Sequence, residues 1–344
     1  MAKRGIAMTQ KMLFFDYRYV EDKFFENHTF NNFEISFYTQ SLTPEVVKTL
    51  PDEILETTTI ISVFIDSVVT DEVINAFKNL RIIATRSTGY DHINLTAAKN
   101  KNIAVVNVEN YGETSVAQYT FGLVIGLIRN FFPAILDMKN IRKRDYNPYG
   151  RDLSKLSIGI VGTGSIGGAM CKMAKCFNMS VFACDINKKR ELAKIGVNYV
   201  SLEELLEKSD IVSLHLPYTG DNYHMFSDRE FEKMKEGAYF INTSRGEIID
   251  ISALYKQLEN KHLGGAALDV LECIDRNYKC KNITDEPLFC EKEVYYVRKF
   301  ADFDNVLITP HIAYATKDAV DYILKTSIKS INDFLAGEKI SRVV

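Results

Sequence analysis

Three glycines, Gly162, Gly164 and Gly167, form a GxGxxG pattern directly after the apolar residues Ile160 and Val161. Glycines at this spacing let the chain turn tightly from a strand into a helix, and they let a pyrophosphate approach the backbone. The amides and the dipole at the start of that helix then bind the phosphates. The pattern therefore predicts a dinucleotide site, although a glycine-rich turn without a ligand and a methyltransferase turn share it.

An acidic residue, Asp185, ends the next apolar run, close to the spacing of about 20 residues at which an acid binds the ribose of NAD. A carboxylate at this place would repel the 2′-phosphate of NADP, so the pair of signals favours NAD. Three basic residues, Lys188, Lys189 and Arg190, follow closely and leave NADP open as the alternative.

Two residues further along the chain have side chains suited to carbonyl chemistry. Arg245 follows the apolar run 238–244, and His311 follows the run 306–309 and Pro310. If both runs are strands of a parallel sheet, these side chains lie at its carboxyl edge, where ligands of doubly wound folds bind. A guanidinium binds a carboxylate with two parallel hydrogen bonds, and an imidazole exchanges protons near neutrality. The two residues predict a 2-oxo acid as substrate, although each could instead satisfy loop carbonyls.

The elements that must position these residues follow an alternating pattern. Short runs rich in β-branched residues alternate with segments of helical spacing, which predicts parallel strands joined by crossover helices and an α/β fold class. One doubly wound series lies before residue 110, and a second begins at residue 156. The predicted strands are 12–17, 33–38, 60–65, 81–85 and 103–108, then 156–162, 181–185, 211–216, 238–243, 266–270 and 306–309.

Three segments stand out as helices. Residues 71–80 repeat apolar side chains at helical spacing. Residues 115–132 are apolar on nearly all sides, which predicts a helix buried between domains or subunits. Residues 316–336 form one apolar face and stop at Gly337. No strand follows this last helix, so we expect it to dock on the first unit.

Composition limits the classes of protein that fit. A chain of 344 residues suggests two domains, and 42 basic against 45 acidic residues give a formal charge of −3, which disfavours a nucleic-acid partner. The apolar run 121–128 is far short of the roughly 20 residues that span a bilayer. The N-terminus lacks the apolar core of a signal peptide, so we predict a cytoplasmic protein without a membrane partner. The six cysteines form no CxxC pair, which predicts reduced thiols and no metal, although Cys273, Cys280 and Cys290 crowd one segment.

The ordered set of motifs resembles the D-2-hydroxyacid dehydrogenases, and within that family most closely the D-lactate dehydrogenase branch. The resemblance covers nearly the whole chain, and it is more specific for the family than for the substrate. The motifs are FFDYR at 14–18, RSTGYDHI at 86–93, NYGETSVA at 110–117, GTGSIG at 162–167, Asp185, HLP at 215–217, NTSRG at 242–246, LDV at 268–270 and TPH at 309–311.

The resemblance implies a domain organisation, a reaction and a quaternary structure. A Rossmann NAD-binding domain, 111–311, is expected to be inserted into a flavodoxin-like doubly wound substrate domain formed by 1–110 and 312–344. The implied activity is NAD-dependent reduction of a small 2-oxo acid, with pyruvate favoured, to the D-2-hydroxy acid. The implied assembly is a homodimer that uses the apolar segment 115–132.

It also implies roles for individual residues. Arg245 is expected to hold the substrate carboxylate with the backbone amides near Thr88 and Gly89, and His311 to exchange a proton with the substrate oxygen. Tyr111 and Tyr314 match positions that line the substrate pocket, although core packing explains tyrosines equally well. The residues expected to bind the cofactor are Gly162, Gly164, Ser165, Ile166, Gly167, Asp185, Leu216, Pro217, Asn222, Thr243, Ser244 and Asp269.

One position departs from the family pattern. The family has a glutamate five residues beyond the aspartate that matches Asp269, and here that residue is Ile274. A carboxylate beside a histidine raises its pKa by about 1–3 units, so its loss is expected to slow pyruvate reduction at neutral pH. A flanking acid, Glu272 or Asp275, could take its place, although Glu272 matches a separate acidic position of this branch. Otherwise the chain is a weakened enzyme, or a non-catalytic NAD(H)-binding sensor or regulatory relative.

Overall fold

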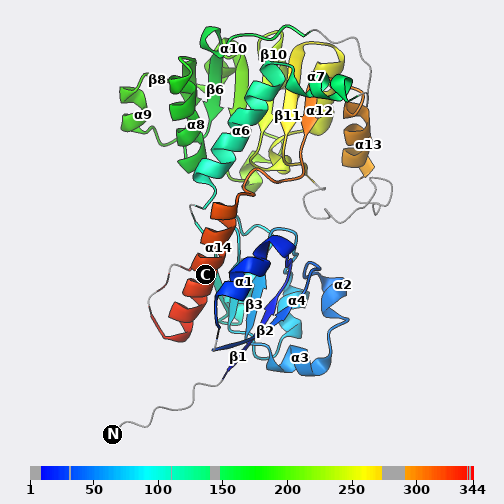
Figure 1. The fold of residues 1–344 in the computed structure, drawn as a ribbon, viewed down its shortest axis with the longest axis vertical. Helices are drawn as coiled ribbons and strands as arrows, with labels where there is room; N and C mark the ends of the chain where they lie inside the picture. The colour runs from blue at the N-terminus through cyan, green and yellow to red at the C-terminus, as the bar shows by residue number, and fades with distance from the viewer. Residues whose placement is uncertain are drawn as a thin grey trace. The chain divides into compact units, whose positions relative to one another are not determined.

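The computed structural model describes residues 9–30, 32–109, 111–139, 148–272, 291–338, 340 and 342–344 (Figure 1). The chain divides into two compact units, one formed by Met1–Tyr111 with Ala315–Val344 and the other by Gly112–Tyr314. The sequence suggested the same kind of division, with its boundaries at 110/111 and 311/312. The roles assigned to the two units stay predictions at this point.

The first unit is built on a parallel sheet with the strand order β2-β1-β3-β4-β5. This is the flavodoxin-like order of a doubly wound sheet. All of the strands predicted before residue 110 are present, each shorter than its apolar run. They are β1 (Gln10–Phe14), β2 (Phe33–Phe37), β3 (Ile60–Val63), β4 (Ile82–Thr85) and β5 (Ala104–Val106).

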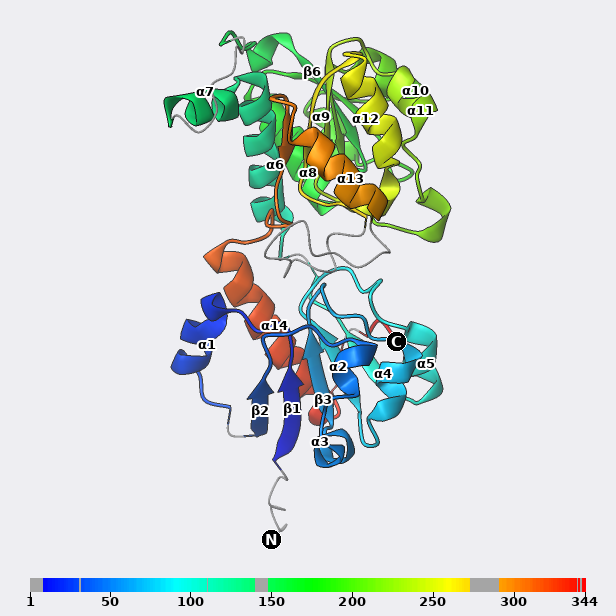
Figure 2. The same ribbon diagram turned by 90° about the vertical axis from the view of Figure 1, so that its right-hand side faces the viewer.

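Helices cover both faces of this sheet (Figure 2). Successive strand residues point to opposite faces, so Met12 packs on one side and Leu13 on the other. On the Met12 face lie η1 (Tyr19–Glu21), α1 (Asp22–Asn27) and the terminal helix α14 (Lys317–Leu335), whose docking on the first unit is confirmed. On the Leu13 face lie α2 (Pro44–Val47), α3 (Asp52–Thr57), α4 (Asp71–Ala76) and α5 (Leu95–Asn100).

Helix α4 ends earlier than the predicted range 71–80. Phe77 leaves the helical conformation with a ψ of 122°, and the backbone amide of Lys78 donates to the carbonyl of Leu55 at 3.0 Å. A bond to α3 therefore replaces the next helical bond, and the apolar spacing alone did not reveal this.

The second unit is built on a parallel sheet with the order β12-β11-β10-β9-β6-β7-β8. From β6 outward this is the Rossmann order, in which the strand sequence reverses between β6 and β9. The strands are β6 (Ser157–Val161), β7 (Ser180–Cys184), β8 (Val197–Tyr199), β9 (Ile211–Leu214), β10 (Ala238–Asn242), β11 (Leu263–Leu268) and β12 (Val306–Ile308). Strand β8 was not predicted, because its three residues form no apolar run.

Two hydrophobic cores lie on the two faces of this sheet. The first contains residues of α6 (Glu113–Ile128), α8 (Ser165–Cys176) and α9 (Arg190–Lys194). The second contains residues of α10 (Leu202–Lys208), α11 (Asp228–Glu232), α12 (Ile251–Glu259) and α13 (Glu291–Phe300). Short 3-10 turns complete the unit at η2 (Leu153–Lys155), η3 (Gly220–Asn222) and η4 (Gly246–Ile248).

The apolar segment 115–132 forms parts of two helices instead of one. Helix α6 ends at Ile128, Asn130 adopts a left-handed φ of 52°, and α7 (Phe131–Met138) continues at an angle of 70°. The buried face of α6 packs on α8 and on the sheet of its own unit. Among the described residues no single helix meets the length and apolarity needed to cross a membrane, and α6 and α7 do so only as this bent pair.

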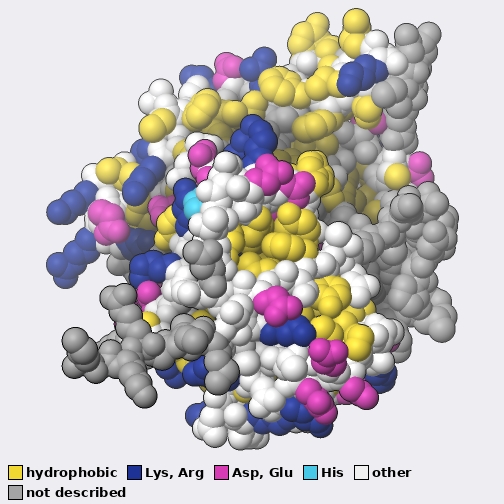
Figure 3. Space-filling model, turned by 60° about the horizontal axis from the view of Figure 1, so that its bottom comes forward, with side chains coloured by type: hydrophobic (Ala, Val, Ile, Leu, Met, Phe, Trp, Pro, Cys, Tyr) yellow, Lys and Arg dark blue, Asp and Glu magenta, His cyan; other side chains and the backbone are white. Residues whose placement is uncertain are grey.

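Charged side chains of both signs are interspersed over the face of the molecule shown in Figure 3, with hydrophobic patches between them. This distribution agrees with a formal charge close to zero for a chain of this length.

Candidate active site and dinucleotide site

The glycine-rich turn between β6 and α8 leaves open space at one of its glycines, where a side chain would otherwise lie. Gly162 has a left-handed φ of +88°, and a Cβ atom there would lie 2.5 Å from the carbonyl oxygen of His215. A Cβ atom on Gly167 would lie 1.9 Å from the carbonyl oxygen of Gly162. A Cβ atom on Gly164 would meet no atom within 4 Å. The first and third glycines thus shape the turn and the second leaves it open, as a dinucleotide pyrophosphate requires.

The carboxylate of Asp185, directly after β7, is tied to this turn. Its Oδ2 accepts hydrogen bonds from the backbone amide of Thr163 at 2.5 Å and from Thr163 Oγ1 at 3.0 Å, and Oδ1 accepts one from the amide of Asn187 at 2.7 Å. Partial burial opposes ionisation, but these bonds outweigh it and lower the pKa of Asp185. The residue is therefore an anion at the edge of the turn, as binding of ribose hydroxyls requires.

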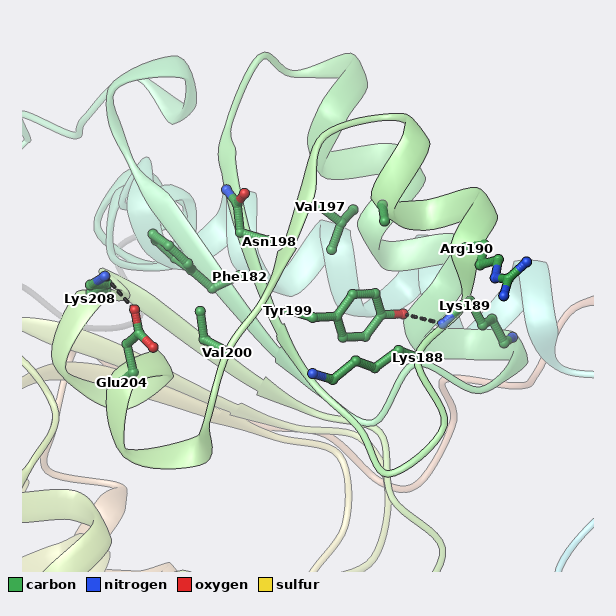
Figure 4. Close-up of a pocket in the computed structure, with 11 residues that line it drawn as sticks. Phe182, Lys188, Lys189, Arg190, Val197, Asn198, Tyr199, Val200, Glu204 and Lys208 are labelled. Atoms are coloured by element: carbon green, nitrogen blue, oxygen red, sulfur yellow. Dashed lines mark hydrogen bonds and ion pairs between the residues drawn. The ribbon is translucent and has the colours of Figure 1, made fainter.

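A cavity of about 550 Å³ lies between β7, β8, α9 and α10 (Figure 4). The hydroxyl of Tyr199 bonds to Thr163 Oγ1 at 3.0 Å and accepts a bond from the backbone amide of Lys189 at 3.0 Å. Lys189 Nζ donates to the carbonyl of Gly164 at 3.0 Å. Lys188 extends past the Tyr199 ring. One of the basic residues beyond Asp185, Lys189, is therefore hydrogen-bonded to the glycine-rich turn.

Arg245 lies in the loop after β10, which the side chain of Asn242 holds by hydrogen bonds. The buried side chain of Asn242 donates to the backbone carbonyl of Arg245 at 2.9 Å, and its Oδ1 accepts bonds from the amide and the hydroxyl of Ser244. The guanidinium, which is half-buried, donates to the carbonyl of Ser244 at 2.8 Å. The loop is thus fixed by one amide side chain at the end of the strand.

His311 lies after β12, two strands away from β10. It has a left-handed φ of 46°, and its backbone amide donates to the carbonyl of Asp269 at 2.9 Å. Its ring packs edge-on against Tyr314, with 6.3 Å between the ring centres. A non-glycine residue in this conformation is strained and persists only where its surroundings hold it.

Asp269, which follows the intervening strand β11, holds the loop of His311 in this conformation. Its carboxylate accepts bonds from Thr309 Oγ1 at 2.5 Å and from the amides of Ile312 and Ala313 at 3.1 and 2.9 Å. Burial raises the pKa of Asp269 despite these bonds. The structure thus joins its side chain to the His311 loop, and its expected contact with the cofactor remains a prediction.

The other residues expected to bind the cofactor lie in loops after β9 and β10. Asn222 Nδ2 donates to the carbonyl of Pro217 at 2.8 Å, and Thr243 Oγ1 bonds to Thr120 Oγ1 of α6 at 2.8 Å. The neighbouring His215 bonds to Ser213 Oγ at 2.9 Å, and loss of water around the ring lowers the pKa of His215 to about 3. Leu216 and Ser244 are half-buried beside these loops, and Ser165 and Ile166 open α8.

In the first unit, Thr88 and Gly89 form the loop after β4. Thr88 Oγ1 donates to the carbonyl of Val108 at 3.0 Å, Asn107 Nδ2 donates to the carbonyl of Thr88 at 2.9 Å, and Ser87 Oγ donates to the carbonyl of Gly89 at 2.6 Å. These bonds fix the backbone of the loop. Tyr111 is half-buried at the end of this part of the chain.

Sequence reasoning did not single out several residues that the structure brings to these loops. Ile186, beside Asp185, is 97% exposed. Thr163 and Tyr199 link the glycine-rich turn to Asp185 and β8. The sequence signal for Ile186 is an apolar residue directly after the acid that follows β7, whereas no sequence signal marks Tyr199.

The departure from the family pattern lies outside the described residues. This applies to Ile274, to the flanking acid Asp275, and to the segment that contains Cys273, Cys280 and Cys290. Glu272 is described, and its carboxylate bonds to Tyr223 and His224.

Comparisons with known proteins agree in the family they indicate. A model of the NAD-binding domain of D-isomer-specific 2-hydroxyacid dehydrogenases matches residues 121–313. A D-specific alpha-keto acid dehydrogenase of Enterococcus faecium is 38% identical over 258 residues, which cover 74% of this chain and 76% of the relative. A glyoxylate reductase of Thermofilum pendens is 34% identical over 273 residues, which cover 78% and 75%. The solved structure of D-lactate dehydrogenase from Aquifex aeolicus, in complex with NAD and lactic acid, is 32% identical, with a TM-score of 0.83 and coverage of 95% of this chain and 96% of that one.

Proposed function

Since the chain belongs to the D-isomer-specific 2-hydroxyacid dehydrogenase family of NAD-dependent oxidoreductases acting on a CH–OH group, we propose that it reduces a small 2-oxo acid to the D-2-hydroxy acid, with pyruvate preferred. The family, the α/β fold class and NAD as cofactor are confirmed as predicted from the sequence. The observation that carries the proposal is that Arg245, Asp269 and His311 follow the adjacent strands β10, β11 and β12.

Arg245 binds the substrate carboxylate in this proposal. A guanidinium matches a carboxylate with two parallel hydrogen bonds, which orients the substrate as well as attracting it. The loop held by Asn242 keeps the arginine backbone fixed, so little conformational freedom is lost when the substrate binds. Thr88 and Gly89 are assigned to the same carboxylate, and Tyr111 and Tyr314 to the walls around the rest of the substrate.

His311 exchanges the proton in this proposal. It donates a proton to the carbonyl oxygen during reduction and removes the hydroxyl proton during oxidation. NAD, when bound, supplies or accepts the hydride at the substrate carbon. Asp269 holds the loop of His311 in its left-handed conformation, which keeps the imidazole in one place during both half-reactions.

The glycine-rich turn, the open position at Gly164 and the anion of Asp185 fit NAD as the bound dinucleotide. We assign Ser165, Ile166 and Gly167 to its phosphates through the start of α8. Ile186, Leu216, Pro217 and Asn222 are assigned to the adenosine end, and Thr243, Ser244 and Asp269 to the nicotinamide end.

Pyruvate is proposed because the related Aquifex aeolicus enzyme was solved with lactic acid, the product of pyruvate reduction. Ile274, in place of the family's glutamate, is proposed to weaken reduction at neutral pH, since a neighbouring carboxylate would otherwise keep His311 protonated.

The experiment that tests this function measures NADH oxidation with pyruvate, glyoxylate, phenylpyruvate and a branched 2-oxo acid between about pH 5.5 and about pH 8. We expect turnover with pyruvate, and its loss by at least about 100-fold in Arg245→Lys and His311→Asn, since each removes a group that acts on the substrate. NADH affinity is expected to stay unchanged in both variants. Tight NADH binding without turnover of any 2-oxo acid would contradict the proposal and favour an NAD(H) sensor.

A homodimer and a cytoplasmic location belong to the same proposal. Helix α7 exposes Phe131, Ile135 and Met138, with 48%, 47% and 80% of their surface accessible. A row of exposed apolar side chains of this kind is typical of a protein interface. Cys171, Cys176 and Cys184 are free thiols, the state typical of a reducing compartment.

A further inference from the structure

Three side chains that the proposed reaction does not use contact one another beside the loop of Arg245. Glu272 Oε1 accepts a hydrogen bond from the Tyr223 hydroxyl at 2.8 Å, and Glu272 Oε2 lies 3.0 Å from His224 Nε2. The tyrosine and histidine rings stack with 3.9 Å between their centres. We call these three residues the Glu272 cluster. It joins the loop after β9 to the loop after β11.

One member of the cluster, His224, has a backbone conformation that neighbouring residues must hold. His224 has a left-handed φ of 49°, a conformation that is strained for a non-glycine residue and persists only where its surroundings hold it. Its backbone amide donates to the carbonyl of Glu247 at 2.9 Å, within the turn η4 that follows Arg245. One histidine therefore binds the Arg245 loop through its backbone and Glu272 through its ring.

The backbone of Glu272 itself lies against the Arg245 loop. A Cβ atom on Gly246 would be 2.2 Å from the backbone nitrogen of Glu272 and 2.2 Å from the carbonyl carbon of Leu271. The two loops thus touch backbone to backbone at the residue that follows Arg245. A displacement of Glu272 would displace Gly246, and Arg245 would move with it.

We propose that Glu272 is a positioning residue for Arg245, held in place by His224 and Tyr223. This rests on the proposed function, in which Arg245 binds the substrate carboxylate. The carboxylate of Glu272 acts on the arginine loop through its two partners, and it is not the substitute for the glutamate that Ile274 replaces. Small misplacements of a substrate-binding group are costly, because a shift of about 1 Å can lower a rate by about 100-fold.

The test compares Glu272→Gln with the matched variant Glu259→Gln. Glu259 also accepts a tyrosine hydroxyl, that of Tyr255 at 2.7 Å, but on the exposed side of α12. For Glu272→Gln we expect the KM for pyruvate to rise by about 10-fold or more and kcat to fall, with the Kd of NADH changing by less than about 2-fold, since the arginine binds and orients the substrate but is not assigned to the dinucleotide. Glu259→Gln is expected to leave all three values unchanged. An unchanged KM in Glu272→Gln would overturn the proposal.

A double-mutant cycle shows whether the effect passes through Arg245. In an Arg245→Lys background the change Glu272→Gln is expected to have little further effect on KM, because the group that it positions is already gone. A further rise in KM as large as in the wild-type background would contradict a positioning role.

A measurement without substrate separates this inference from the proposed function. The backbone amides of Ile248 and Ile249 bond to the carbonyls of Arg245 and Gly246. Their hydrogen–deuterium exchange is expected to become at least about 10-fold faster in Glu272→Gln and to stay unchanged in Glu259→Gln. If the protein reduces no 2-oxo acid, the proposed function fails, while exchange at these two amides still decides whether Glu272 holds the loop. Unchanged exchange would overturn the inference in either case.

Discussion

Two carboxylates at the carboxyl edge of the same sheet have pKa values shifted in opposite directions by their surroundings. Hydrogen bonds from Thr163 and Asn187 outweigh partial burial and lower the pKa of Asp185, whereas deep burial raises the pKa of Asp269. Asp185 is half-buried beside the glycine-rich turn, whereas Asp269 is almost wholly buried and holds the loop of His311. The sequence identified both acids, but it could not divide their roles, because their partners lie far away along the chain.

The residue that departs from the family pattern gives a prediction at the level of a single side chain. Ile274→Glu is expected to raise turnover of pyruvate more at about pH 7–8 than at about pH 5.5, because an added carboxylate keeps a histidine protonated where it would otherwise lose its proton. Steady-state rates at both pH values check this. An equal gain at both values, or no gain, would contradict the account.

The lowered pKa of His215 makes the stability of the second unit depend on pH. In the folded chain its pKa is about 3, whereas in the unfolded chain it is about 6.5. Below about pH 6.5 the unfolded state therefore binds a proton that the folded state rejects, and the free energy of unfolding falls as the pH drops toward 3. For this one proton, the free energy of unfolding falls by at most roughly 1.4 kcal/mol per pH unit. Urea unfolding of His215→Asn is expected to show a shallower loss between pH 6.5 and 4.5 than the wild type, and parallel curves would refute this assignment.

Much of the arrangement of helices and strands follows from hydrophobic pattern and turn chemistry. The strands that carry Asp185, Arg245 and His311 lie where the apolar runs placed them, because runs this apolar are stable only when buried on both faces of a sheet. Strand β8 and the break between α6 and α7 were missed. Three residues give no period, and the break depends on Asn130 in a left-handed conformation, which apolar spacing does not reveal.

The site is less accessible to sequence reasoning than the strands. His224 and Glu272 are separated by 48 residues, and Thr163 and Tyr199 by 36. Such contacts depend on how the loops meet at the sheet edge, so spacing along the chain cannot predict them. The sequence identified Arg245, His311 and Asp269, but it did not reveal that Asp269 holds the loop of His311.

The turn between β6 and α8 gives a prediction that separates folding from binding. Gly164→Ala is expected to fold with little loss of stability, since its methyl group meets open space, but to weaken NADH binding by about 10-fold or more, because a pyrophosphate approaches the backbone there. Gly167→Ala is expected to lower stability as well, since its Cβ atom would collide with the Gly162 carbonyl.

Thermal unfolding and NADH titration of both variants check this pair. Equal stability losses in Gly164→Ala and Gly167→Ala, or NADH binding that is unchanged in Gly164→Ala, would contradict the assignment of this turn to the dinucleotide.

The apolar surface of α7 leads to a prediction about the oligomeric state of the protein. Replacing Ile135 and Met138 with aspartate is expected to convert a dimer into monomers, because burying charge in an apolar interface is unfavourable. Sedimentation at micromolar concentration checks the oligomeric state of both proteins. A wild-type chain that sediments as a monomer would refute the dimer, and an unaffected variant would place the interface elsewhere.

The handedness of the product shows whether the protein is a D-2-hydroxyacid dehydrogenase that acts on pyruvate. Purified protein is incubated with NADH and pyruvate, and the lactate formed is resolved on a chiral column. We expect D-lactate in an amount equal to the NADH oxidised. Formation of L-lactate would contradict the proposed function. Binding of NADH with no lactate formed at any pH between about 5.5 and about 8 would contradict it as well.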